Sequence, residues 1–180
     1  MKRIIIVVLL SSFTIYCFSQ RGGDIFAEDK IDDMTGNEII KTYWLQLKMG
    51  MTISYYAQLC IHEDFLYLNI KVGTGFVTSV PEDAKLIFKF KDNTTITLQN
   101  HKYILSGKGE GAIGLIGASQ IGINPIYSIT LSDLETFEKQ NIVKLRLYLR
   151  DKYIETKISQ NKAKIFSNYC EAMKKRINKS

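Results

Sequence analysis

The sequence predicts a mainly β (α+β) fold: an antiparallel β-sandwich or partly open barrel, with a short helix near residues 131–140 and a C-terminal helix. Apolar and polar residues alternate along most of the chain, which is typical of strands with one buried and one solvated face. The pairs Asp92-Asn93 and Asp151-Lys152 separate neighbouring strands and predict tight hairpins. The apolar stretches recur at hairpin distances, not at the roughly 30-residue spacing of βαβ units.

Four segments carry the clearest alternation and are expected to form strands. They read MTISYYAQLCI (51–61), FLYLNIKV (65–72), KLIFKFK (85–91) and VKLRLYLR (143–150). Because side chains of a strand point alternately to its two faces, one set in each segment should be buried and the other solvated. In the last two segments the residues predicted to face solvent are Lys85, Lys89, Lys91, Lys144, Arg146, Tyr148 and Arg150.

Two helices are predicted to interrupt the strands. In the short helix near 131–140, Ser132 precedes Glu135 by three residues, which is the spacing of a capping box. In residues 161–178, apolar residues recur at helical spacing and cations fall in the last turn, where the helix dipole favours them. We expect the second helix to pack across an end or an open face of the sheet, and a helix lying on a membrane surface is the alternative.

Residues 1–19 read as a secretory signal peptide, with Lys2 and Arg3 before an apolar run too short to span a membrane. Cleavage between Ser19 and Gln20 is expected, which leaves residues 20–180 as a single β-rich domain. A lipoprotein signal with Cys17 as the acylated residue and a retained anchor helix are the alternatives. The expected location is periplasmic or at the cell surface.

Charge argues against a nucleic-acid-binding role. The formal net charge is +6, and Lys2 and Arg3 would leave with the signal peptide. Acidic residues are interspersed among the basic ones, whereas nucleic-acid binding requires a basic stripe. The expected partner is therefore a protein, an envelope component or a small ligand. A weak affinity for anionic lipid or polysaccharide stays open.

Two cysteines remain after cleavage, Cys60 and Cys170. In an oxidising compartment they could form one disulfide, which would stabilise the fold by about 4–5 kcal/mol in the chain-entropy model. The pattern also fits two unpaired thiols, because Cys170 falls on the apolar face of a helix and Cys60 on the polar side of its strand.

No group of residues marks a catalytic, cofactor or metal site. The histidines are His62 and His101, and neither belongs to the regular spacing that a zinc site uses. The sequence also lacks the common nucleophile and metalloprotease motifs. Tyr56, Tyr67 and Tyr148 fall on polar strand faces, where they could stack on sugars, but tyrosines are also good strand formers. An enzymatic role is uncertain, and the sequence favours a non-enzymatic one.

The glycine-rich segment 107–123 contains G-x-G-x-x-G over residues 109–114, the spacing of a dinucleotide-binding loop. Such a loop needs a helix that begins at the third glycine, because the pyrophosphate binds at that N-terminus. Two further glycines and Pro125 oppose a helix here. No nucleotide cofactor is therefore expected.

Two interpretations of this segment remain. It is either a glycine-kinked strand that turns a corner of the sandwich or an apolar flap over a ligand, a partner or a membrane surface. The kinked strand is the favoured one. The residues that would make contacts in a flap are Gly111, Ile113, Leu115, Ile116 and Ile121.

The turn DDMTGNE (32–38) and the unit YSITLSDLETFEKQNIVKLRLYLRD (127–151), followed by a terminal helix, resemble small exported proteins of unknown function from Bacteroidetes. Those proteins carry a D-x-[FM]-T-G turn near the start and a strand–helix–strand unit near the end. The resemblance implies a β-rich periplasmic or surface module, and it supplies no catalytic residues.

Together these observations predict an exported, non-enzymatic β-domain that acts as a binding or structural module of the cell envelope. A hydrophobic-ligand carrier, with segment 107–123 as its mouth, is the alternative and requires a continuous apolar cavity. An exported hydrolase is the third hypothesis. It requires His62 or His101 within hydrogen-bond reach of a serine, cysteine or carboxylate in a cleft.

Overall fold

The computed structural model describes residues 25–50 and 53–179, so the predicted signal peptide and its cleavage site lie outside the described residues. The strands form an eight-stranded sheet, a four-stranded sheet and a short two-stranded one. All of their pairings are antiparallel, as the alternating sequence predicts.

The large sheet is built around one long hairpin. Its strands are β1 (Phe26–Ile31), β2 (Glu38–Thr42), β3 (Leu45–Lys48), β4 (Ser54–His62), β5 (Phe65–Gly73), β10 (Gly107–Lys108), β11 (Ile121–Ile123) and β12 (Ile126–Ser128). β4 and β5 pair along their whole length, from Ser54 opposite Gly73 to His62 opposite Phe65. β2 and β3 pair with successive parts of the other edge of β4, and β11 and β12 pair with successive parts of the other edge of β5.

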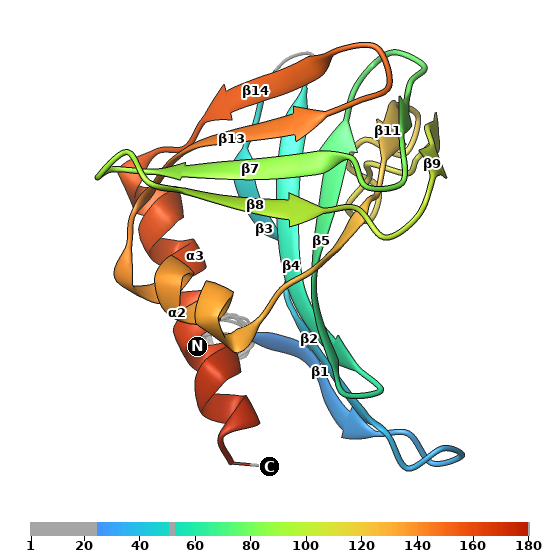
Figure 1. Cartoon of the computed structure of the whole chain (residues 1–180). Coiled ribbons are helices and arrows are strands. Elements are labelled where there is room, and N and C mark those ends of the chain that lie inside the picture. The colour runs from blue at the N-terminus through green and yellow to red at the C-terminus, as the bar shows by residue number, and fades with distance from the viewer. Residues whose placement is uncertain (1–24, 51–52, 180) are drawn as a thin grey trace, which may run out of the picture.

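The second sheet has the order β14-β13-β7-β8. These strands are β14 (Tyr153–Lys157), β13 (Ile142–Tyr148), β7 (Lys85–Phe90) and β8 (Thr95–Gln99), and β6 (Ser79–Val80) pairs with β9 (Ile104–Leu105) in the third sheet. The two predicted hairpins are present, because β7 pairs with β8 and β13 with β14. The strands of the second sheet run across those of the large sheet (Figure 1), so the architecture is an open sandwich and not a closed barrel.

The core lies between the two sheets and the helices α2 (Leu131–Lys139) and α3 (Gln160–Ile177). Four phenylalanines from the second sheet and both helices contact one another there. The Phe137 ring of α2 lies 5.0 Å from that of Phe88, 5.8 Å from that of Phe90 and 5.3 Å from that of Phe166 in α3. Because each ring is at most 1% exposed, this cluster fastens both helices to the second sheet.

The helix α2 begins at Leu131, as predicted, but its N-cap is Thr130 and not Ser132. The capping box joins Thr130 and Asp133: the Asp133 backbone N–H donates to Thr130 Oγ1, and the Thr130 N–H donates to the Asp133 carboxylate. The predicted pair of Ser132 and Glu135 was wrong, because Thr130 is the last residue with an extended backbone. Glu135 instead pairs with Lys139 at 3.2 Å within the helix.

The prediction of one solvated face fails for β4. Tyr56, Gln58 and Cys60, the residues of its polar face, are all buried. β4 is an inner strand of the large sheet. Cys60 lies opposite Lys41 of β2 and Tyr67 of β5, and the longer side chains of these two residues cover the short Cys60 side chain. The second sheet keeps the predicted pattern, with apolar residues buried and cations toward solvent.

Candidate functional site

The glycine-rich segment is anchored at both ends. β10 pairs with β11, and β11 pairs with the end of β5. Gly111 packs against the β5 backbone so closely that a Cβ at this position would lie 2.6 Å from the Gly73 nitrogen. Gly122 likewise has the Gly111 backbone against it. These glycines are required by close approach of three chain segments, which is how glycines in strands are often used.

Between those ends the segment makes a series of turns and not the helix of a dinucleotide loop. Of the residues predicted to make contacts, Gly111 and Ile121 belong to the anchored base. Ile113, Leu115 and Ile116 lie at the tip, where Ile113 and Ile116 bridge each other. Leu115 is 95% and Ile116 63% exposed. The base is therefore architecture, whereas the tip presents two apolar side chains to solvent.

Cys60 and Cys170 are free thiols, and both are fully buried. Cys170 of α3 belongs to the core cluster between the sheets, whereas Cys60 points away from that core. The two sulfurs therefore do not pair in this structure. Burial raises the pKa of the Cys60 thiol to about 12 and raises that of Cys170 as well, so neither thiol supplies a nucleophilic thiolate near neutral pH.

His101 and Ser128 come together at the edge of the large sheet. The His101 ring nitrogen Nε2 is hydrogen-bonded to Ser128 Oγ, and the His101 backbone N–H donates to the Ile126 carbonyl at 3.1 Å. Both residues line a cavity of about 500 Å³ that also includes Glu82, Asp83 and Asp133. Within the part of the chain that the structure describes, no carboxylate hydrogen-bonds the His101 ring. This pair meets the geometric requirement set out for a hydrolase.

No sequence signal marks Ser128. Its contact with His101 exists because β12 lies beside the end of β8, where Asn100 and Tyr127 form a bridge. His62, the second histidine, lines a separate cavity of about 360 Å³ that shares His101 and Ser128 with the first. The structure thus brings both histidines to one region, which sequence spacing could not indicate.

An apolar cleft of about 440 Å³ also has Ser128 in its lining and involves the Glu38 end of β2, the β4–β5 turn and the end of α3. These elements extend beyond the second sheet at the same end of the molecule (Figure 1). Its lining residues are Glu38, Ile61, Asp64, Phe65, Leu66, Ser128, Ile129, Leu131 and Ile177. Phe65 is 71% and Leu131 48% exposed, so the cleft offers apolar surface to a ligand. We call this site the apolar cleft.

The β4–β5 turn forms one edge of the apolar cleft. Glu63 and Asp64 have φ values of 51° and 64°, a left-handed conformation that glycine and asparagine adopt more easily. Both residues form the two-residue loop between His62 and Phe65, and a type I′ hairpin turn requires this conformation at both positions. The turn places the Asp64 carboxylate at the rim of the cleft, opposite the end of α3.

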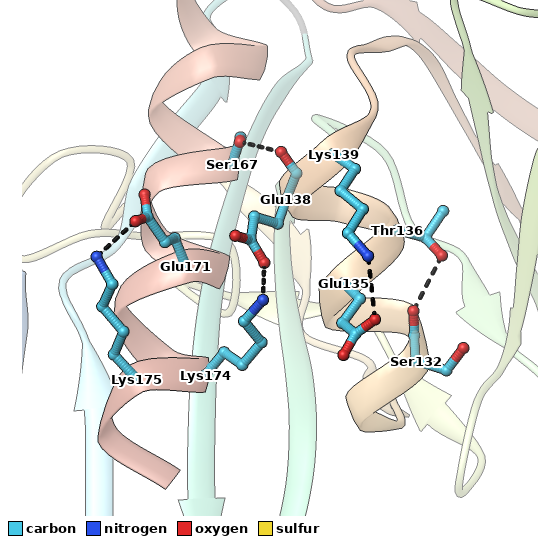
Figure 2. A network of polar contacts seen from close by, with 9 residues as sticks. All are labelled: Ser132, Glu135, Thr136, Glu138, Lys139, Ser167, Glu171, Lys174 and Lys175. Atoms are coloured by element: carbon cyan, nitrogen blue, oxygen red, sulfur yellow. Dashed lines mark hydrogen bonds and ion pairs between the residues drawn. The ribbon is translucent and has the colours of Figure 1, made fainter. Parts of the chain in front are cut away.

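Polar contacts hold α2 and α3, which supply the other walls, at a fixed separation (Figure 2). Ser167 Oγ of α3 donates to the Glu138 backbone carbonyl of α2 at 2.7 Å, and the Lys174 ammonium group pairs with the Glu138 carboxylate. The hydrogen bond from Lys174 to Glu138 raises the pKa of Lys174. Because Ser167 and Lys174 lie more than one helical turn apart on α3, the two contacts fix the direction of α3 relative to α2 as well as the distance between the two helices.

The last turn of α3 is tied to the large sheet by Arg176. Its guanidinium donates to both carboxylate oxygens of Asp29 in β1 and, at 3.0 Å, to Glu38 in β2. Ile177, the next residue, lines the apolar cleft. Arg176 therefore holds the cleft's helix wall against its sheet wall, and it partly neutralises the Glu38 carboxylate at the rim.

Comparisons with protein-family models, curated proteins and solved structures found no match for this chain. The resemblance to exported Bacteroidetes proteins therefore stays a prediction. Among residues 25–50 and 53–179, no helix is long and apolar enough to cross a membrane. Within the same ranges, no three His, Cys, Asp or Glu residues lie close enough together to hold a metal ion.

Proposed function

We propose that this protein is an exported, non-enzymatic binding module of the cell envelope, and that its ligand places an apolar group in the apolar cleft. The observation that carries this proposal is the cleft itself, with Phe65 and Leu131 exposed at its mouth. Its volume of about 440 Å³ falls within the range of small-molecule sites. Covering a leucine or phenylalanine side chain completely contributes about 1.5–3 kcal/mol, so these residues give a ligand substantial binding energy.

The chemistry of the rim narrows the class of ligand. Glu38 and Asp64 both line the cleft, and Arg176 offsets only one of these two carboxylates. An apolar group attached to a neutral or cationic end fits this distribution, whereas a fatty acid carboxylate would be repelled by Asp64. We therefore expect an apolar peptide segment or a neutral small molecule.

The fixed walls support binding over a structural role. Lys174, Ser167 and Arg176 hold α3 against α2 and the large sheet from separate positions. A site whose walls are already in place loses little conformational entropy when a ligand enters.

The carrier hypothesis with segment 107–123 as its mouth receives no comparable support. The space between the sheets is filled by side chains such as Tyr55, Phe88 and Tyr127, each at most 2% exposed. The apolar cleft opens at the Phe65 end of β5, whereas the glycine-rich segment joins β5 at its Gly73 end. A ligand in the cleft would therefore not touch that segment.

Titration with N-phenyl-1-naphthylamine, a neutral apolar dye that fluoresces more strongly in apolar surroundings, tests the proposal. Leu131→Asp should weaken binding about tenfold, which corresponds to losing about 1.4 kcal/mol of apolar contact. An aspartate in the first turn suits the helix dipole, so α2 should remain intact.

Leu115→Asp is the matched control, because Leu115 is exposed but lies at the tip of the glycine-rich segment. It should bind the dye as the unmodified protein does. Loss of binding in Leu115→Asp with retention in Leu131→Asp would instead favour the carrier. No saturable binding by the unmodified protein would remove the basis of the proposal.

Acyl transfer is a second candidate function, and the specific observation in its favour is the hydrogen bond between His101 and Ser128. In such a reaction Ser128 Oγ attacks an ester carbonyl while His101 takes the serine proton and passes it to the leaving alcohol. Water then releases the acyl group. This function predicts that a fluorophosphonate probe adds one covalent adduct, located on Ser128 by peptide mass spectrometry. Ser128→Ala should abolish the adduct, and Ser119→Ala, an exposed serine of the glycine-rich segment, should not.

A further inference from the structure

The outer face of the second sheet carries three lysines directly opposite one another. Lys144 of β13 is paired with Lys157 of β14 on one side and with Lys89 of β7 on the other. Neighbouring strands lie about 4.8 Å apart, so the three side chains rise from adjacent positions in one line across the sheet. Like charges placed directly opposite each other destabilise a sheet. This line of lysines is therefore poorly explained by folding.

The negative charge nearby compensates only part of the line. The Glu155 carboxylate lies 2.8 Å from the Lys144 ammonium group and 2.7 Å from the Arg146 guanidinium. Lys89 and Lys157 have no ion pair with any residue in the ranges that the structure describes. We call the surface formed by Lys85, Lys89, Lys144, Arg146 and Lys157 the basic face, which carries these five cations and the carboxylate of Glu155.

The basic face is hollowed and carries groups other than cations. A cavity of about 320 Å³ is lined by three cations, one carboxylate, a hydroxyl group and an apolar side chain: Lys89, Lys144, Arg146, Glu155, Thr95 and Ile87. One row further along, the rings of Tyr148 and Tyr153 lie 5.8 Å apart. The face therefore combines positive charge with a hydroxyl group and two aromatic rings.

We infer that the basic face is a docking surface for an acidic polysaccharide. Charge complementarity is the first argument, because successive carboxylates of an extended polyanion can meet Lys157, Lys144 and Lys89 in turn. Binding such a polymer would also relieve the repulsion within the lysine line. The hydroxyl of Thr95 and the ring of Tyr153 suit the hydroxyls and the C–H faces of sugars, which a simple inorganic anion lacks.

Two other polyanionic partners fit this face less well. A protein that binds an anionic membrane usually inserts apolar side chains as well as presenting cations. Among the described residues of this face, the large aromatic or apolar side chain that is mostly exposed is Tyr153. Proteins that bind single-stranded nucleic acid stack successive bases on a series of aromatic rings along the strand, whereas the rings of this face are gathered in one pair, Tyr148 and Tyr153. Both partners serve as outcomes of the test below.

This inference does not depend on ligand binding in the apolar cleft. The basic face is the solvent side of the second sheet, whereas the other side of β7 packs on the phenylalanine cluster. The apolar cleft lies beyond α2, among residues that do not belong to this sheet. Leu131→Asp should therefore leave polysaccharide binding unchanged, so either proposal can fail alone.

Binding of fluorescently labelled polygalacturonate, a polymer with a carboxylate on each sugar, tests the inference. The double variant Lys89→Thr/Lys157→Thr removes two cations that have no ion pair, and threonine is a good strand former. We expect its Kd at low ionic strength to rise about tenfold, with a weaker dependence on salt. The matched control is Lys164→Gln/Lys179→Gln, which removes the same charge from exposed positions near the C-terminus and should change Kd less than about twofold.

Several results would overturn the inference. One contrary result would be that the unmodified protein fails to bind polygalacturonate, or binds neutral dextran equally well. Another would be an equal rise in Kd for the two double variants, which would indicate a general effect of net charge. A final contrary result would be that phosphatidylglycerol vesicles or a single-stranded oligonucleotide bind the basic face more tightly than polygalacturonate does. Each of these outcomes excludes an acidic polysaccharide as the partner for which the face is suited.

Discussion

Arg176 and Asp29, separated by 147 positions in the chain, form a two-pronged ion pair in which the guanidinium donates to both carboxylate oxygens. This contact joins the last turn of the C-terminal helix α3 to the strand β1. The same guanidinium reaches Glu38 on the neighbouring strand. One side chain thus connects β1, β2 and α3, of which β2 and α3 line the apolar cleft.

Arg176→Gln is expected to lower the free energy of unfolding by about 1–2 kcal/mol, because a two-pronged charged contact of a partly buried arginine is lost. It should also weaken dye binding in the apolar cleft. Urea denaturation measures the first effect. Arg150→Gln is the control, since Arg150 lies 3.9 Å from Asp151 and both side chains are largely exposed. Similar losses in the two variants would contradict a special role for Arg176.

Lys89→Thr is expected to raise the free energy of unfolding by about 0.2–1 kcal/mol, because it interrupts the line of like charges across the second sheet. Lys85→Thr, on the same strand and the same face, is the control: Lys85 lies opposite Gln99 on β8, so no such relief is expected from that pair. The measurement is the midpoint of thermal or urea unfolding of each variant, compared with that of the unmodified protein. A loss of stability in Lys89→Thr would show that this lysine contributes to folding.

Acid should weaken the second sheet through Glu155. The hydrogen bonds from Lys144 and Arg146 lower the pKa of Glu155 below its ordinary value of 4.5. Because the folded-state pKa is the lower one, the stabilisation is complete above pH 4.5 and is lost as the pH falls toward the depressed pKa. Unfolding in urea at pH 7 and at pH 3 should therefore differ less in Glu155→Gln than in the unmodified protein. Glu82→Gln, at an exposed position, should retain the full difference.

Gly111→Ala is expected to destabilise the protein by about 1–3 kcal/mol, because the added methyl group would overlap the backbone of Val72 and Gly73. Gly114→Asn should be nearly neutral, since Gly114 has open space around it and asparagine tolerates its φ of 58°. Thermal unfolding distinguishes the two positions. Equal tolerance at both would mean that the base of the segment is not closely packed.

Local signals predicted the sheets well. The alternation in KLIFKFK and VKLRLYLR correctly separates buried from solvated residues, because it follows from the two-residue period of a strand. The pairs at 92–93 and 151–152 correctly mark hairpins for a similar local reason. The same approach failed for Cys60, because burial on the second face of β4 depends on the lengths of side chains from neighbouring strands.

The candidate sites could not be predicted, because each one depends on register or on contacts between distant segments. Alternation shows that Lys89, Lys144 and Lys157 face solvent, but only the pairing of three strands places them in one line. His101 meets Ser128 because the end of β8 lies beside β12. The apolar cleft needs the C-terminal helix to reach a turn more than 100 residues earlier in the chain. No sequence motif encodes these distances.

The burial of both native thiols has a practical consequence for labelling chemistry. Cys60 and Cys170 are inaccessible, and their raised pKa values keep them protonated, so maleimide reagents should pass them over in the folded protein. A cysteine introduced at Leu115, 95% exposed, would then be the one reactive thiol among the described residues. A fluorophore or spin label attached there would sit at the opposite end of β5 from the cleft, where it could report on tumbling and complex formation without blocking either proposed site.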